Sequence, residues 1–274
     1  MKAAAFDYAR PRDLGEAVRL LASGGGSAKL LAGGQSLGPM LNLRLARPKL
    51  LVDVSRLGEL RGITDAGNSW RIGAAVTHAE IEDTVGTLAG GEMLPLVAAG
   101  IAYRSVRNRG TIGGSLAHAD PSADWPLALA ALDASVVING AKGERSVSVD
   151  RLIRAAFTTD IAEDEIVTAV TVPKLSPSAR VGYFKFCRKT GEFAEAAAAA
   201  VVDPERRVAR IFLGALSGAP HSLPALARRV AEDGAAACSR ETALEAVAAL
   251  PLDAVDRRMH AGVLLRALQQ IYPS

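Results

Sequence analysis

The sequence predicts an α+β fold, in which strands with intervening helices are followed by three successive helices. Short apolar or alternating segments bounded by Gly, Pro and Asp recur between residues 28 and 216, which is the pattern of β-strands. Beyond them, residues 223–232, 240–249 and 256–270 place apolar side chains at helical spacing. A sheet followed by a run of helices is typical of the α+β class.

The first 54 residues predict a helix, a strand, a glycine-rich turn, a second helix and a second strand. Residues 13–21 have the spacing of an amphipathic helix, which three glycines end. A strand over 28–32 opens into the Gly-Gly pair at 33–34, and residues 37–45 predict a helix that stops before Pro48. Residues 50–54 predict the next strand.

The central segment contains a second glycine pair and a proline that closes a strand. Residues 70–76 alternate as a strand, and Thr77 with Glu80 has the pattern of a capping box that begins a helix. After the second glycine pair, we predict a helix over 125–132 and strands over 135–138 and 165–172. Because Pro173 and the polar residues 174–180 follow, we predict two domains, 1–173 and 174–274.

The second domain is predicted to contain strands over 183–186, 194–202 and 208–216 before its three helices. Residues 196–200 are all alanine, which by itself favours a helix. The valines at 201 and 202 and the rhythm of the neighbouring strands favour a sheet. We therefore predict a strand there.

Composition and charge exclude several functional classes. The chain has 274 residues, 49% of them apolar, and its 32 basic against 29 acidic residues leave a net charge of +3. So small and evenly spread an excess does not indicate nucleic-acid binding. We find no apolar stretch long enough for a membrane span, and Asp7 interrupts the opening residues before a signal-peptide core develops. We expect a cytoplasmic protein.

The metal-ligating residues are few and scattered. Cys187 and Cys238 form no CxxC pair, and the four histidines show no HExxH-like spacing. An iron–sulfur cluster requires about four thiolates, so this chain is not expected to hold one, nor any other metal. No nucleophile–base arrangement is recognisable either, and we predict no catalytic side chain. Redox work by this chain would need an organic cofactor.

The two glycine pairs suit an anionic ligand. Missing Cβ atoms let a ligand approach backbone N–H groups, and successive N–H groups that face one way bind phosphate. Neither pair matches the GxGxxG or GxxxxGK[ST] fingerprint, and either alone could be an ordinary turn. Arg107 and Arg109 could neutralise phosphate or lie in solvent, and Asp120 and Asp124 could accept ribose hydroxyls or serve as a turn opener and a helix cap.

A resemblance to a known family rests on these motifs. The segments AGGQSL at 32–37 and VRNRGTIGGS at 106–115, with AHADP at 117–121, resemble the FAD motifs of the medium subunit of aerobic carbon monoxide dehydrogenase and its xanthine dehydrogenase-type relatives. The resemblance continues through TVP at 171–173, FKF at 184–186, KTGEFA at 189–194 and RIFLG at 210–214. It covers nearly the whole chain.

The resemblance implies a set of cofactor-binding residues. The first glycine segment with its flanking leucines and the second glycine segment would hold the FAD diphosphate, and four further residues would line the flavin, ribityl or ribose parts. Phe193 stands where relatives often have tyrosine, and Ser115 replaces an Asp or Asn of some relatives. The implied residues are Leu31, Ala32, Gly33, Gly34, Gln35, Ser36, Leu37, Thr111, Ile112, Gly113, Gly114, Ser115, Asp124, Val167, Lys185 and Phe193.

The resemblance also implies a fold and an assembly. The first domain would be a two-subdomain FAD-binding domain of the vanillyl-alcohol-oxidase (PCMH) type, followed by a smaller domain of the carbon monoxide dehydrogenase flavoprotein type. Hydroxylation would take place at molybdopterin on a large subunit, and 2Fe–2S clusters on a small subunit would deliver electrons to FAD in a dimer of heterotrimers. A free-standing FAD-dependent reductase and a non-catalytic nucleotide-binding assembly protein are the alternatives.

Overall fold

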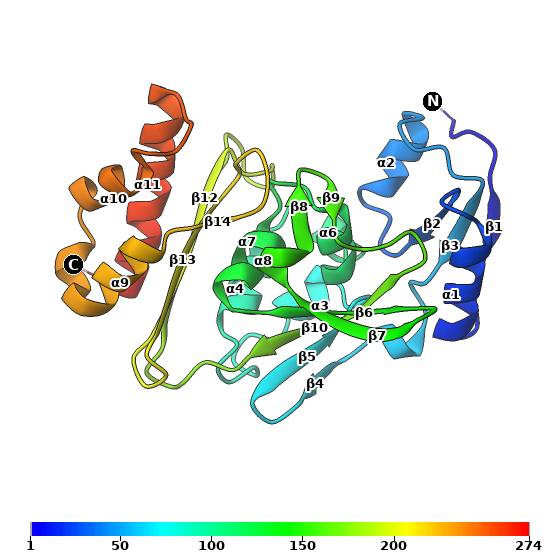
Figure 1. Ribbon diagram of the computed structural model, residues 1–274, viewed down its shortest axis with the longest axis horizontal. Coiled ribbons are helices and arrows are strands. Elements are labelled where there is room, and N and C mark those ends of the chain that lie inside the picture. Colours follow the sequence, from blue (N-terminus) through cyan, green and yellow to red (C-terminus); the bar gives the residue numbers. More distant parts are fainter. Residues whose placement is uncertain (1, 274) are drawn as a thin grey trace.

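The computed structural model describes residues 2–273 and has the α+β architecture that the sequence predicts (Figure 1). A small parallel sheet lies at the N-terminal end, an antiparallel sheet with helices occupies the middle, and a third sheet covered by the last helices forms the C-terminal end.

The N-terminal sheet has the strand order β1-β3-β2, and all of its strands are parallel. Helix α1 begins at the cap residue Asp13, whose side chain accepts from the Glu16 amide, and it buries Ala17, Val18 and Leu21 against the sheet. The elements of this part are β1 (Asp7–Ala9), α1 (Leu14–Ser23), β2 (Ala28–Leu31), α2 (Leu37–Asn42) and β3 (Leu50–Asp53).

The central sheet is antiparallel, with the order β4-β5-β10-β6-β7, and helices α3 to α8 accompany it. Its strands are β4 (Ile63–Asp65), β5 (Ser69–Gly73), β6 (Ser135–Gly140), β7 (Gly143–Ser148) and β10 (Ile166–Pro173), beside the hairpin β8 (Ile153–Ala155) and β9 (Thr158–Thr159). Its helices are α3 (His78–Glu82), α4 (Met93–Ala99), α5 (Arg104–Arg107), α6 (Ile112–His118), α7 (Asp124–Ala131) and α8 (Val149–Leu152). Short 3₁₀ helices lie at Gly58–Leu60, between β3 and β4, and at Gly234–Ala237, after α9.

The third sheet is antiparallel and follows the sequence order β11-β12-β13-β14. The alanine-rich segment is a strand, as predicted, and every residue of it is buried between β11 and β13. The elements are β11 (Arg180–Phe186), β12 (Ala196–Asp203), β13 (Val208–Gly214), β14 (His221–Ser222), α9 (Pro224–Asp233), α10 (Arg240–Val247) and α11 (Ala254–Ile271).

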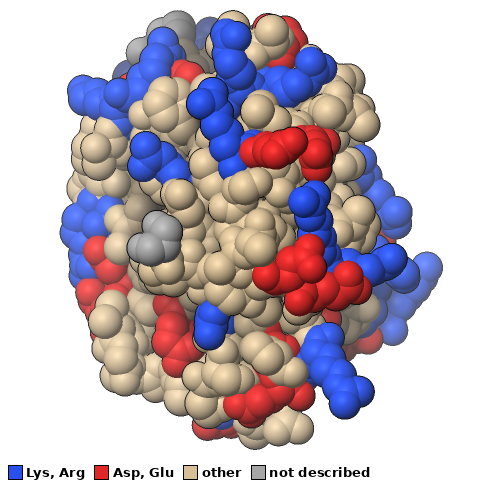
Figure 2. All heavy atoms as spheres, turned by 90° about the vertical axis from the view of Figure 1, so that its left-hand side faces the viewer, with Lys and Arg blue, Asp and Glu red and all other residues tan. Residues whose placement is uncertain are grey.

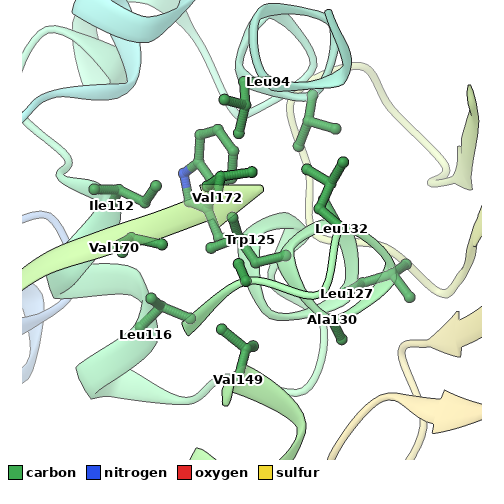
Figure 3. Packing of buried hydrophobic residues seen from close by; sticks show 14 of the residues in the cluster. Leu94, Ile112, Leu116, Trp125, Leu127, Ala130, Leu132, Val149, Val170 and Val172 are labelled. Carbon is green, nitrogen blue, oxygen red and sulfur yellow. The ribbon is translucent and has the colours of Figure 1, made fainter. Parts of the chain in front are cut away.

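The largest hydrophobic core surrounds helix α7, whose residues are all buried. Figure 3 shows Trp125 of this helix next to Leu94, Ile112 and the β10 residue Val172. The same core includes residues of β11, β12 and β13, so it continues past Pro173 into the C-terminal sheet. A second core lies between the other face of that sheet and helices α9 to α11.

The predicted strand that leads toward helix α3 ends early in the structure, and the reason bears on the site. The strand expected over 70–76 ends at Gly73, and residues 74–76 leave the sheet. Their carbonyls instead accept hydrogen bonds from the start of helix α6, from Ile112 N to Val76 O at 3.1 Å and from Gly113 N to Ala74 O at 3.0 Å. Strand β5 therefore ends where helix α6, distant in the sequence, takes over the backbone carbonyls.

Charged side chains are mixed over the C-terminal face. Figure 2 shows Lys and Arg side chains interspersed with Asp and Glu around an uncharged centre, on the side of the molecule where the C-terminal helices lie. Side chains of both signs occur on this face, in line with the small net charge. Within residues 2–273, no helix combines the length and the apolar character needed to cross a bilayer.

Candidate cofactor site at the glycine motifs

The first glycine segment forms an open turn between β2 and α2. Gly34 has a φ of +73°, a left-handed conformation that side chains disfavour, and Gln35 folds its side-chain amide back onto the Gly33 carbonyl at 3.3 Å. Among the described residues, no acceptor is bonded to the backbone amides of residues 33–36. Successive free N–H groups of this kind form a concave binding site for an anion such as a diphosphate.

The second glycine segment is organised differently from our expectation. Thr111 caps helix α6, and the glycine pair lies inside the first helical turn. The amides of Ile112 and Gly113 bond to the carbonyls of residues 76 and 74, and Gly114 N donates to Thr111 Oγ1 at 3.1 Å. These N–H groups are therefore engaged within the protein and form no second free row of amides. Gly113 is buried against Ala74, so this segment presents to a ligand the Cβ-free Gly114 and the Ser115 side chain.

The two glycine segments are in direct contact. A Cβ added at Gly33 would lie 2.0 Å from the Arg109 carbonyl oxygen and 2.9 Å from the Gly110 Cα, so only glycine fits there. Arg109 also donates from Nε to Gly33 O at 3.4 Å, across 76 positions of the sequence. The fold thus brings the two segments together, as one cofactor site requires.

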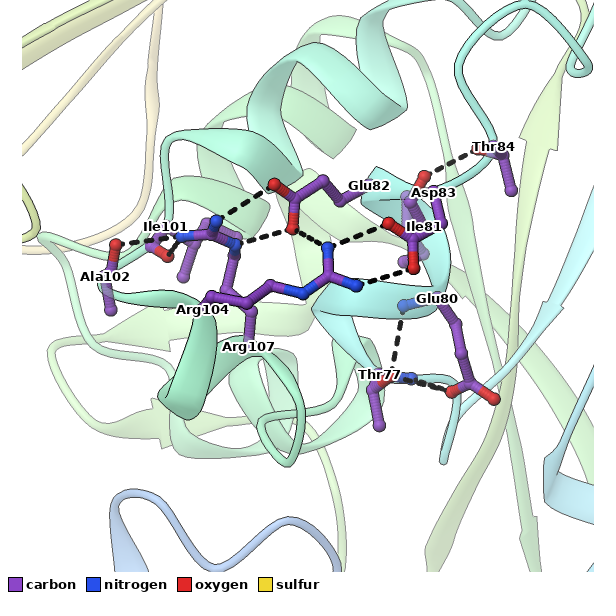
Figure 4. Close-up of polar contacts among 10 residues, drawn as sticks. All are labelled: Thr77, Glu80, Ile81, Glu82, Asp83, Thr84, Ile101, Ala102, Arg104 and Arg107. Atoms are coloured by element: carbon purple, nitrogen blue, oxygen red, sulfur yellow. Dashed lines mark hydrogen bonds and ion pairs between the residues drawn. The ribbon is translucent and has the colours of Figure 1, made fainter.

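Helix α5, which directly precedes the second glycine segment, is held in place by a network of ion pairs (Figure 4). The Arg107 guanidinium, whose side chain is 11% exposed, donates to both oxygens of Glu82 at 2.8 and 2.9 Å and to the carbonyls of residues 101–102. Arg104 bridges Glu82 and Asp83. These hydrogen bonds, that from Arg107 above all, lower the pKa of Glu82. Arg107 is therefore neither the free surface arginine nor the phosphate ligand that its sequence position suggested, because its donors are used in fixing helix α5.

His78 is a buried polar residue beside this turn that sequence reasoning did not single out. Its Nδ1 accepts from Trp125 Nε1 at 3.0 Å, and its backbone amide donates to Gly110 O at 2.9 Å. Burial, with a smaller contribution from the nearby Arg107 charge, lowers the pKa of His78 to about 4. The imidazole is therefore neutral at pH 7, and with Nδ1 as the acceptor its proton is on Nε2.

Asp124 and Lys185, which were predicted separately, form a buried ion pair. Lys185 Nζ lies 2.8 Å from Asp124 Oδ1 and 3.1 Å from Oδ2. Tyr183 donates its hydroxyl to Asp124 Oδ1 at 2.7 Å. Burial and then the Asp124 charge raise the pKa of Tyr183 well above its usual range, so the hydroxyl keeps its proton. The sequence contained one indication that Tyr183 belongs with this pair. Tyr183 lies two residues before Lys185 on the same strand, and residues two apart on a strand share a face.

The remaining predicted residues lie on several elements. Val167 is buried on β10, at an irregularity in its pairing with β6, and Leu31 ends β2. Phe193 is 62% exposed on the connection between β11 and β12. Gly191 precedes it with a φ of +90°, and a Cβ there would lie 3.1 Å from the Tyr103 ring.

Comparisons with known proteins agree with this geometry. Residues 4–175 match the family described as the FAD binding domain in molybdopterin dehydrogenase. The chain belongs to this family. As a member of it, the chain is the FAD-binding medium subunit of a molybdenum hydroxylase, and its cofactor is FAD.

Relatives of this flavoprotein subunit have a similar length and fold. The carbon monoxide dehydrogenase medium chain of Hydrogenophaga pseudoflava is 40% identical over 197 residues, which cover 72% of this chain and 69% of that one. The alpha subunit of the 6-hydroxypseudooxynicotine dehydrogenase complex of Paenarthrobacter nicotinovorans is 40% identical over 220 residues, 80% of this chain and 74% of the relative.

Solved structures extend the likeness to the whole chain. Carbon monoxide dehydrogenase from Hydrogenophaga pseudoflava matches with a TM-score of 0.89 at 32% identity, over 99% of each chain. Reconstituted CO dehydrogenase from Oligotropha carboxidovorans matches with a TM-score of 0.90 at 31% identity, again over 99% of each chain. The medium subunit is thus an oxidoreductase subunit whose relatives act within multi-subunit enzymes.

Proposed function

We propose that this medium subunit receives electrons from 2Fe–2S clusters on a small partner subunit and passes them through FAD to an external acceptor. Hydroxylation of the organic substrate would take place at a molybdopterin centre on a large partner subunit. The observation that carries the proposal is the row of free amides at residues 33–36, which the second glycine segment locks in place. Bound FAD supplies the ability to accept electrons singly and release them in pairs.

The chain's own part in this reaction is to bind and orient the cofactor. We propose that residues 32–36, with Leu31 and Leu37 on either side, hold the diphosphate through backbone N–H groups. Residues 111–115 would let the diphosphate approach closely, since Gly114 carries no side chain and Gly113 seats the segment against Ala74. Asp124, Val167, Lys185 and Phe193 would line the flavin end.

The names of the relatives support an assembly with partner subunits. One relative is called a complex subunit, and others are called medium chains or subunits. We propose a dimer of heterotrimers in the cytoplasm. We also propose the division into an FAD-binding domain over 1–173 and a C-terminal domain over 174–274, which the match over residues 4–175 supports.

The proposed division of labour is tested by mixing the FAD-loaded full chain anaerobically with candidate substrates. The panel includes carbon monoxide, nicotine, caffeine and glyceraldehyde, which are the compounds in the names of relatives, together with purines. We expect no bleaching of the flavin absorbance by any of them, and full bleaching by dithionite as the control. Bleaching by an organic substrate at a turnover-like rate would show a self-contained flavoenzyme instead.

The partners are tested by purifying the tagged chain from its native host. We expect a complex that contains FAD, a subunit with iron and a larger subunit with molybdenum, measured by flavin extraction, elemental analysis and mass spectrometry. A yellow protein that purifies alone would favour the free-standing reductase. A colourless one would favour the nucleotide-binding assembly protein.

A further inference from the structure

We propose that Tyr183 is a positioning residue for the flavin, which acts through Asp124 to fix the Lys185 ammonium at the cofactor. The inference rests on the proposed function, in which Lys185 lies at the flavin end of the site. It assigns the three side chains different tasks: Lys185 faces the cofactor, Asp124 holds Lys185, and Tyr183 holds Asp124.

The three groups form one buried cluster between two distant segments. Asp124 is the first residue of helix α7, and Tyr183 and Lys185 lie on β11, 59 and 61 positions further along the chain. Asp124 is 6% exposed, Tyr183 is 9% exposed and the Lys185 side chain is 11% exposed. Charges this deeply placed are stable only when they are paired and hydrogen-bonded, so the geometry of the cluster is well defined.

Both oxygens of Asp124 are occupied by protein donors. Oδ1 accepts from the Tyr183 hydroxyl at 2.7 Å and lies 2.8 Å from Lys185 Nζ, while Oδ2 accepts from Nζ at 3.1 Å. In this arrangement Asp124 anchors its neighbours, and Oδ2, which within the described part of the chain is bonded only to Lys185 Nζ, keeps a lone pair for a further donor. An ammonium has three N–H donors, and no acceptor outside Asp124 is bonded to Nζ among residues 2–273. Lys185 thus retains donors for a ligand.

The position of Tyr183 is itself fixed by the backbone. Its amide donates to Gln270 Oε1 at 2.9 Å, and its carbonyl accepts from Gln270 Nε2 at 3.1 Å. Helix α11 thereby clamps the edge strand β11 at this residue, where Gly182 leaves room for the helix backbone. A side chain on a clamped backbone loses little further entropy when it orients Asp124, so it is suited to hold a charge in one place.

The experiment compares full-length Y183F, K185Q and the double variant with wild type. K174Q is the matched control, because Lys174 also pairs with an aspartate, Nζ to Asp65 Oδ1 at 2.6 Å, but at the surface and above the Trp70 ring. The measurements are the FAD Kd by fluorescence titration, the flavin midpoint potential, and the melting temperature without FAD. In case Y183F does not fold, D124N removes the same anchor.

We expect K185Q to weaken FAD binding by about tenfold and Y183F by about fivefold, in line with the loss of hydrogen bonds to a charged group. Both should shift the midpoint potential to more negative values, because a cation held at the flavin favours the added negative charge. The double variant should match K185Q alone, since Tyr183 acts through Lys185. K174Q should leave both quantities unchanged.

Two results would overturn the inference while leaving the proposed function intact. If Y183F lowers only the melting temperature, with the Kd and the potential as in wild type, the cluster is a structural tie between α7 and β11. Effects of Y183F and K185Q that simply add would show that Tyr183 acts independently of Lys185. Failure of the wild-type chain to bind FAD would instead reject the proposed function, and this inference with it.

Discussion

Gly33 and Gly34 are neighbours that lack side chains for different physical reasons. At Gly33 the obstacle is the backbone of the other glycine segment, which a Cβ would meet at 2.0 Å. At Gly34 the requirement is conformational, since its φ is +73°. The first glycine joins the two segments, and the second turns the chain so that its amides are free.

Gly33→Ala should therefore affect both the fold and the cofactor. The new Cβ forces the Arg109 carbonyl away, which is a case of overpacking and costs about 1–3 kcal/mol of unfolding free energy. We expect lower stability in urea denaturation and loss of bound FAD. The control is Gly38→Ala, where a Cβ enters open space inside helix α2 and should stabilise the protein slightly. Equal stability of the two variants would contradict this explanation.

Gly114→Asp should instead abolish FAD retention with little loss of fold. A Cβ at Gly114 meets only the Thr111 cap oxygen, at 2.8 Å, so the structural cost is limited to disturbing a helix cap, about 1 kcal/mol. The added carboxylate would lie where an anionic diphosphate is proposed to bind, and the two charges repel. The measurements are the flavin content after purification, which should be lost, and the thermal transition, which should stay close to that of wild type. Full flavin occupancy in the variant would remove Gly114 from the site.

His78 should make stability depend on pH. Its pKa is lowered from 6.5 to about 4 in the folded protein, so the unfolded chain binds the proton more tightly. The stabilising contribution is complete above pH 6.5 and is lost as the pH falls toward 4, by about 3 kcal/mol in all. His78→Asn should reduce the difference in unfolding free energy between pH 7 and pH 4.5, measured by urea titration. The exposed His221→Asn should not, and an unchanged difference in His78→Asn would contradict the assignment.

At the scale of elements, the alanines of β12 let helices pack on both faces of one strand. Ala196, Ala198 and Ala200 belong to the core beneath α9 to α11, whereas Ala197 and Ala199 belong to the core around α7. The alternation has the period of two that a strand requires. Helix propensity is overridden here because pairing with both β11 and β13 satisfies the backbone, and small side chains admit the two layers of helices.

Ala199→Leu should consequently destabilise the protein. Ala199 is 0% exposed within the core that includes α7, and three extra carbons have no space there without movement of the helix. We expect a loss of about 1–3 kcal/mol, seen as a lower melting temperature. Ala141→Leu, in the exposed turn between β6 and β7, is the matched control and should leave the melting temperature unchanged. A melting temperature for Ala199→Leu equal to that of wild type would show that α7 can move at little cost.

At the scale of the whole molecule, the cofactor-binding part and the C-terminal part share a core. Tyr183, Ala197, Ala199 and Phe212 pack in the same cluster as Trp125. The C-terminal segment also supplies Lys185, which neutralises the buried Asp124. The two domains that we propose therefore have separate sheets but share one hydrophobic core.

A chain ending at Pro173 should not fold stably by itself. The apolar face of α7 that β12 and β13 cover would be exposed to water, and Asp124 would lose its cation. We expect aggregation or strong binding of a hydrophobic dye, and a broad thermal transition in circular dichroism in place of a cooperative one. A monomeric fragment that melts cooperatively near the temperature of the full chain would show that the first domain is independent.

The sequence alone determined the features that depend on neighbours along the chain. Hydrophobic periodicity and helix signals predicted the α+β class and most of the larger strands and helices, and the Thr77–Glu80 capping box is present as predicted. The helix Met93–Ala99 was missed, since Pro95 interrupts its pattern and every residue from Met93 to Ala98 except Leu96 is buried. The short strands β1, β4, β8, β9 and β14 were also missed, because so few residues show little periodicity. The six-residue strand β7 was missed because Val147 is its only large apolar residue.

Only the tertiary structure decided how distant residues are used. The sequence could not show that Gly113 faces Ala74, that Arg107 is bonded to Glu82, or that Tyr183 orients Asp124. A hydrogen bond or a close approach depends on where packing places two segments, and local propensity carries no information about a partner some 25 to 60 positions away. Residue type therefore indicated which side chains could serve a cofactor, and the fold determined which donors and amides remain free to do so.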